Sequence, residues 1–228
     1  SYFGRLGYSL SDKYLFEANL RADASSRFAE GNRWGIFPGF SAGWRVIDEG
    51  FMPASSTLSN LKLRASWGQL GNQNISGYWP YLTVINQNNE LSYSYNGTFS
   101  PGAAVTSLVD ENITWETTTT IDFGADFGFF DDKVNLVFDY FKKRTSDIIV
   151  QLPIPSVLGG LSAPYENVGE MYNTGLEFAL NYNNQKLNRD DFAYDLGVNL
   201  TYVTNEVTSF RGGDSPDQLF LIREGYSY

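Results

Sequence analysis

The sequence predicts an all-β protein: an antiparallel transmembrane β-barrel segment of about eight strands, in one partial barrel domain covering residues 1–228. Apolar and polar residues alternate with a period of two, for about ten residues at a time. Shorter turns follow the first, third, fifth and seventh strands, and longer loops follow the others, as in membrane barrels. Aromatic residues make up 16% of the chain, which suits strands flanked by interfacial aromatic girdles.

The first four strands are expected at residues 2–10, 14–23, 36–46 and 61–68. In the second of these, Phe16, Ala18 and Leu20 share one face, while polar residues occupy the other. The turn between the first two strands is Ser11-Asp12-Lys13, which consists of residues that favour turns. A polar loop is expected at residues 24–33, and a connection with Gly50, Pro53 and several serines at residues 47–60.

The last four strands are expected at residues 118–128, 134–143, 174–182 and 192–203. The first pair forms a hairpin around the acidic turn Asp131-Asp132-Lys133. Two long irregular sections interrupt this half of the chain, at residues 69–115 and 144–168. The outward face of the hairpin should carry Ile121, Phe123, Phe127, Val134, Leu136, Phe138 and Tyr140.

Most charged residues of the strands fall on the second face, where they are expected to line a hydrated lumen. Shifting one strand by a single residue would move these charges into the apolar layer, so the register is strongly specified. A basic residue at the membrane midplane costs roughly 2–4 kcal/mol. The predicted lumen-lining residues are Glu17, Asn19, Arg21, Arg45, Arg64, Asp122, Asp126, Asp139, Glu177 and Asp195.

Composition excludes several functions. The formal net charge of −10 argues against a nucleic-acid partner, because no basic stripe is present. The chain has no cysteine or histidine, so thiolate and imidazole metal sites are excluded. We expect no catalytic residues, no metal and no cofactor.

Aromatic side chains in the longest connection are candidates for contact with a substrate or a partner. Trp79, Tyr81, Tyr93 and Tyr95 lie among asparagines and other polar residues. Aromatic faces beside amide groups suit sugar or peptide binding, and they also suit a protein interface. Packing of the loop on itself would explain the same residues.

Two other functions fit parts of the pattern. A secreted or surface β-sandwich that binds glycans would pack its apolar faces against each other and leave no exposed apolar belt. A hydrolytic enzyme would need two carboxylates about 5–9.5 Å apart in an accessible cleft. Because acids on strand faces are common in hydrated barrels, we expect pairing with other charges instead.

Several blocks of the sequence resemble the SusC/RagA-type TonB-dependent transporters of the Gram-negative outer membrane. The resemblance covers nearly the whole chain. The blocks are SYFGRLGYSLSDKYLFEANLRADASSRFAEGNRWGIFPGFSAGWRV, LSNLKLRASWGQLGNQNI, ITWETTTTIDFGADFGFFDDKVNLVFDYFKKRTSDIIVQLPIP and NVGEMYNTGLEFALNY.

The resemblance implies a multi-pass barrel of about 22 strands in the cell outer membrane. It further implies an internal plug, energy supplied through the TonB complex, and import of oligosaccharides or oligopeptides. A SusD-like surface lipoprotein would close over the barrel as a lid. We find no plug segment in this sequence, so we expect the rest of the barrel and the plug to lie outside these 228 residues. The surrounding lipid is a further expected partner.

Overall fold

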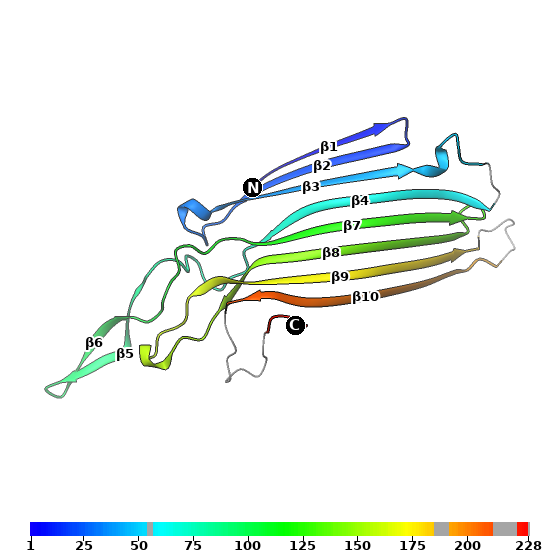
Figure 1. The fold of residues 1–228 in the computed structure, drawn as a ribbon. Coiled ribbons are helices and arrows are strands. Elements are labelled where there is room, and N and C mark those ends of the chain that lie inside the picture. Colours follow the sequence, from blue (N-terminus) through cyan, green and yellow to red (C-terminus); the bar gives the residue numbers. More distant parts are fainter. Residues whose placement is uncertain (54–56, 185–191, 212–222, 228) are drawn as a thin grey trace.

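The fold is a single curved antiparallel sheet of eight strands with a separate two-stranded hairpin beside it, as seen in a computed structural model (Figure 1). The structure describes residues 1–53, 57–184, 192–211 and 223–227. Strands of the large sheet pair in the order β1-β2-β3-β4-β7-β8-β9-β10. Their bounds are β1 Tyr2–Leu10, β2 Tyr14–Ala24, β3 Trp34–Arg45, β4 Leu58–Asn72, β7 Glu116–Phe129, β8 Val134–Gln151, β9 Tyr165–Asn183 and β10 Asp195–Phe210.

The predicted eight-stranded antiparallel sheet is confirmed. Several strands extend past the alternating segments, and the largest differences are in the second half of the chain. β8 continues to Gln151 and β9 starts at Tyr165, within a section expected to be irregular. β10 begins three residues later than predicted, at Asp195, and continues to Phe210. Backbone pairing continues there because each strand has a neighbour, even where the alternation of side chains has ended.

The separate hairpin consists of β5 Ile85–Tyr95 and β6 Thr98–Val105. The expectation that residues 69–115 are irregular throughout is therefore wrong. Asn96 and Gly97 form the turn with φ of 49° and 78°. Positive φ at both central residues is the geometry that favours a tight hairpin turn, and Asn-Gly is its preferred sequence.

The connections that follow β1, β3 and β7 leave the large sheet at one end, called here the short-connection end because it holds the tight turns β1–β2 and β7–β8 (Figure 1). The connections that follow β2, β4 and β8 leave at the other end, called here the long-connection end because it holds the longest one, residues 73–115. At the short-connection end, Ser11 and Asp12 both adopt positive φ, and Lys13 N–H donates to Leu10 O at 3.1 Å. Three 3-10 turns also lie in connections: η1 Glu30–Asn32, η2 Val46–Asp48 and η3 Ser156–Leu158. No helix in the described part of the chain is long and apolar enough to cross a membrane.

A small buried core joins the connections at the long-connection end. Its members are Phe28, Phe37, Ile75, Ile113 and Trp115. The Phe37 ring lies 5.4 Å from that of Trp115, edge to face. It also covers Gly71, where an added Cβ would approach the Phe37 ring to 1.9 Å. Glycine at position 71 therefore lets the ring pack closely against β4.

Polar contacts tie the same connections together. The amide of Asn32 donates to the backbone oxygen of Asn112 at 3.1 Å, and the indole N–H of Trp115 donates to the Arg33 oxygen at 3.1 Å. Asn167 in β9 donates to the Thr114 oxygen at 3.0 Å. Because these bonds join segments far apart in the sequence, the base of the long connections is a packed unit.

Candidate functional site

The large sheet has one apolar face, and that face is exposed. Large side chains from every strand contribute to it, including Leu6 at 77% exposure, Phe123 at 54% and Leu200 at 62%. In the described part of the chain, no second sheet packs against this one, since the only other sheet is the β5–β6 hairpin, which lies beyond one end of it (Figure 1). A sandwich would bury this face against another sheet. The observed arrangement therefore disagrees with the sandwich alternative.

Aromatic side chains border the apolar face at both ends, and at the long-connection end Tyr2 stacks on Trp34 with ring centroids 6.0 Å apart. At the short-connection end, Tyr14 stacks on Trp44 with ring centroids 6.4 Å apart. On the same border, Tyr182 and Tyr194 lie 5.7 Å apart. Such girdles with polar tips are typical of side chains at the interface between hydrocarbon and water.

The opposite face is polar, and Arg64 on β4 is its most connected residue. Its Nε lies 3.0 Å from each carboxylate oxygen of Asp126 on β7, and its Nη2 lies 2.8 Å from Oδ1. Nη2 also lies 2.9 Å from Asp139 Oδ1 on β8, forming an ion pair across three strands. Gly124 makes room, because a Cβ there would lie 2.2 Å from Asp139 Oδ1 and 2.7 Å from Arg64 Cζ.

Two further acids predicted to line the lumen lie beside this cluster. Glu177 is directly opposite Asp139 in the β8–β9 register. Asp122 is opposite Phe141 in the β7–β8 register, two positions along β8 from Asp139. Four carboxylates thus lie around one guanidinium, which pairs with two of them, Asp126 and Asp139. No group of three or more acids in the described residues has an arrangement that could hold a metal ion.

The remaining predicted lumen residues form separate local contacts. Glu17 pairs with Arg5 on β1 and accepts a hydrogen bond from Asn19 at 2.8 Å. Arg21 pairs with Asp23 on its own strand. Arg45 pairs with Asp48 at 3.0 Å, at the short-connection end. Asp195 is the first residue of β10, opposite Asn183.

The four loop aromatics occupy different environments. Tyr81 packs against the small core and accepts a hydrogen bond from Arg33 at 3.5 Å. Trp79 is 53% exposed and lies beside Tyr78. Tyr93 and Tyr95 lie on β5 and are 60% and 74% exposed. The hairpin therefore presents two of the four side chains to solvent, while Tyr81 has a structural role.

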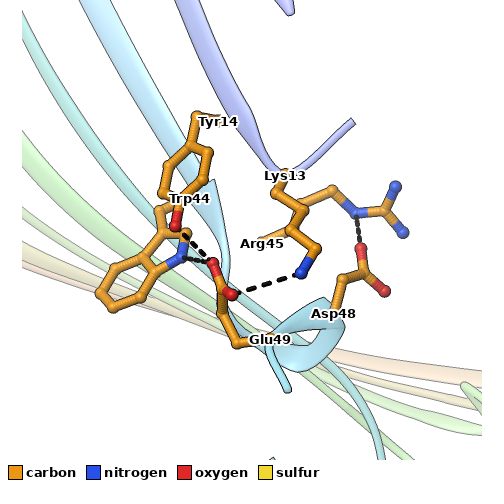
Figure 2. A network of polar contacts seen from close by, with 6 residues as sticks. All are labelled: Lys13, Tyr14, Trp44, Arg45, Asp48 and Glu49. Carbon is orange, nitrogen blue, oxygen red and sulfur yellow. Dashed lines mark hydrogen bonds and ion pairs between the residues drawn. The ribbon is translucent and has the colours of Figure 1, made fainter. Parts of the chain in front are cut away.

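A polar network at the short-connection end was not predicted from the sequence. Glu49 accepts hydrogen bonds from the Tyr14 hydroxyl at 2.6 Å, the Trp44 indole at 3.0 Å and the Lys13 ammonium at 3.2 Å (Figure 2). The hydrogen bond from Tyr14 is the main cause that lowers the pKa of Glu49, and Trp44 and Lys13 lower it further. The sequence signal that could have found this network is the acid Glu49, which lies in the connection just after Trp44 near the end of β3.

The comparisons with known proteins all point to one family. Residues 1–227 match the family described as TonB dependent receptor-like, beta-barrel. The chain is 38% identical over 218 residues to the TonB-dependent receptor SusC of Bacteroides thetaiotaomicron, covering 95% of this chain and 21% of that protein. It is 34% identical over 217 residues to the TonB-dependent receptor P26 of Formosa agariphila, with the same shares covered.

Solved structures of the RagAB peptide importer share the fold. The closed-closed state superposes with a TM-score of 0.85 at 25% identity, covering 98% of this chain and 24% of that chain. The open-open state gives a TM-score of 0.83 at 26% identity, with the same shares. The chain spans about a fifth of the length of the curated relatives it matches.

Proposed function

Because this chain belongs to the TonB-dependent receptor β-barrel family, whose members are barrels of the outer membrane, we propose that it forms part of the wall of a nutrient importer. Its cargo is an oligosaccharide or an oligopeptide. Cargo crosses a hydrated lumen after a plug moves, with energy delivered through the TonB complex. The chain contributes no covalent chemistry to this process.

The observation that carries the proposal is the difference between the two faces of one sheet. The apolar face is exposed over every strand, whereas the opposite face holds ion pairs such as Arg64 with Asp126. In a membrane the first face meets lipid and the second lines water or a plug. The short turns then lie on the periplasmic side and the long connections on the extracellular side.

Two further features support a partner outside the membrane. The exposed β5–β6 hairpin projects beyond the long-connection end of the sheet (Figure 1). Its Tyr93 and Tyr95 offer aromatic surface beside amide and hydroxyl groups. We assign these two residues, together with Trp79, to contact with a SusD-like lipoprotein or with cargo that the lipoprotein delivers.

Cysteine labelling tests the orientation of the two faces. The 228 residues contain no cysteine, so each introduced thiol in this part is unique. We expect Phe138→Cys to resist a membrane-impermeant maleimide in the full-length protein in intact membranes, and to react after detergent extraction. Its neighbour Val137→Cys is the matched control, because it faces the aqueous lumen. Equal labelling of both positions in intact membranes would overturn the proposal.

Growth and co-purification test the transport role. Cells lacking the gene are expected to lose growth on one class of nutrient, either oligosaccharides or peptides, and to regain it with the wild-type gene. Gentle detergent extraction followed by mass spectrometry should recover a surface lipoprotein with the full-length barrel. Unchanged growth on both classes would contradict the importer assignment.

A further inference from the structure

Two basic side chains lie on the apolar face where that face gives way to polar residues. Lys142 and Arg144 follow Tyr140 at alternate positions along β8, so all three point outward from the sheet. The Lys142 ammonium lies 4.6 Å from the centre of the Tyr172 ring on β9. Arg144 is directly opposite Tyr172 in the register.

The spacing of tyrosines along β9 places this pair at the level of lipid head groups. Tyr182 borders the apolar face at its periplasmic end, and Tyr172 lies ten positions further along the same strand and face. Ten residues of antiparallel strand span about 34 Å. A strand tilted by about 40° reduces this to a height of about 25 Å, which is the usual thickness of the apolar band. Tyr172 and Lys142 therefore mark the extracellular border.

Two acids, Glu170 and Glu206, share this border with the two cations, but the ion pairs of the described residues leave donors of both cations unused. Arg144 Nη2 donates to Glu170 at 2.6 Å, which leaves the other nitrogens of its guanidinium available. Lys142 is exposed, and no carboxylate in the described residues forms an ion pair with it. Two residues of strand separate the two cations by about 7 Å, so one phosphorylated group can contact both.

We propose that Lys142 and Arg144 form a binding site for the phosphorylated head group of an outer-leaflet lipid. The ammonium and the free guanidinium nitrogens donate to phosphate oxygens, and Tyr172 supplies the interfacial ring beneath them. The acyl chains then lie along the apolar face below Tyr140. Glu206, opposite Tyr172 on β10, bounds the site on its far side. This inference rests on the proposed orientation of the sheet in the membrane.

The adjacent lysine provides a matched control. Lys143 follows Lys142 but faces the polar side, where its ammonium lies 5.2 Å from the Phe141 ring. Lys142→Gln and Lys143→Gln therefore remove the same charge from opposite faces of one strand. Arg144→Lys keeps the charge and tests the guanidinium geometry without leaving Glu170 unpaired.

Native mass spectrometry of the full-length protein measures the site directly. The probes are a lipid A carrying its phosphates, the same lipid without phosphate, and inorganic phosphate. Lys142→Gln is expected to weaken binding of the phosphorylated lipid about tenfold, and Lys143→Gln less than twofold. The dephosphorylated lipid should bind equally to all variants.

Three results would overturn the site: equal loss in both lysine variants, no loss in either, or competition by inorganic phosphate at the same concentration as lipid. A failure of the proposed function would appear separately, as equal cysteine labelling at positions 137 and 138.

Discussion

The hydroxyl of Tyr14 lies 2.6 Å from Oε1 of Glu49, and the same oxygen lies 3.0 Å from the Trp44 indole nitrogen. Tyr14 and Trp44 face each other across β2 and β3, with their rings stacked at an interplanar angle of 14°. One carboxylate in the following connection thus holds the polar tips of two girdle aromatics. Glu49 fixes these rings at the proposed periplasmic border of the membrane.

Replacing Glu49 should destabilise this end of the barrel more than replacing its neighbour Asp48. Glu49→Ala leaves the Tyr14 hydroxyl and the indole N–H without their acceptor, whereas Glu49→Gln keeps an acceptor and loses the charge. Asp48→Asn removes only a partly exposed ion pair with Arg45, which is worth about 0–1 kcal/mol. Thermal unfolding of the full-length protein should give the highest midpoint for Asp48→Asn, a lower one for Glu49→Gln and the lowest for Glu49→Ala. A Glu49→Ala midpoint equal to that of Asp48→Asn would contradict this role.

The network also predicts loss of stability in acid. Hydrogen bonding by Tyr14, followed by Trp44 and Lys13, lowers the pKa of Glu49 in the folded protein from its ordinary value of 4.5. A group whose pKa is lower in the folded than in the unfolded protein makes its full contribution to stability above its unfolded pKa. That contribution is lost as the pH falls through the folded pKa. The difference in stability between wild type and Glu49→Gln should therefore be constant at neutral pH and shrink below pH 4.5. A difference independent of pH down to pH 3 would exclude the charge as its origin.

The core at the long-connection end should depend on Phe37. The side chain is 7% exposed, and truncation of a buried phenylalanine typically costs about 3–5 kcal/mol. Phe37→Ala should therefore make the long connections sensitive to proteolysis in the full-length barrel. Phe99→Ala is the matched control, because this ring is 79% exposed on the hairpin.

Gly71→Ala tests the same core from the other side. The new methyl group would collide with the Phe37 ring, so we expect loss of stability in the single variant. Adding Phe37→Leu should restore part of that loss, because the smaller side chain leaves room for the methyl group. Additive effects of the two substitutions would show that the ring and Gly71 do not interact.

The sequence predicts the large sheet well because burial in a membrane imposes a strict pattern on each strand. A one-residue slip would place Arg64 or Asp126 in lipid, so the alternation carries the register as well as the strand. The hairpin of β5 and β6 lacks this constraint, since both of its faces meet water. Only its Asn96-Gly97 turn carried a local signal.

The same contrast between periodic strands and other segments decides which site residues the sequence could predict. Alternation assigns Asp126, Asp139 and Arg64 to one face, but it does not show that these side chains meet across three strands. That contact depends on the register between strands and on the space above Gly124. The Glu49 network was missed because its acid lies in a connection, outside any periodic pattern.

The Arg64 cluster should show strong energetic coupling. Arg64→Met leaves Asp126 and Asp139 close together without their cation, whereas Asp126→Asn removes one acid and keeps the shape. We expect the double variant to be more stable than the sum of the two single effects predicts, with a coupling of about 0.5–3 kcal/mol. A double-mutant cycle on urea unfolding of the full-length protein measures it. Arg21 and Asp23, which pair on one strand with the arginine 65% exposed, form the control pair and should couple weakly.

The hairpin should be dispensable for folding and required for recognition outside the membrane. Its strands pair only with each other, and Ile85 lies opposite Val105, so a short Gly-Ser linker can replace residues 85–105. The bridge between Ser107 and Ser162 holds the following segment in place. We expect the full-length variant to insert into the membrane at wild-type level and to lose most of its co-purifying lipoprotein or its nutrient uptake.

Tyr93→Ala combined with Tyr95→Ala should reproduce that loss if the two exposed rings carry the contact. Tyr81→Ala is the informative comparison, because this ring packs against the core and its removal should lower loop stability instead. Outer-membrane yield, protease resistance of the loops and uptake of labelled cargo, measured on the same samples, separate the two effects. Normal uptake and normal lipoprotein recovery in the double tyrosine variant would remove Tyr93 and Tyr95 from the recognition surface.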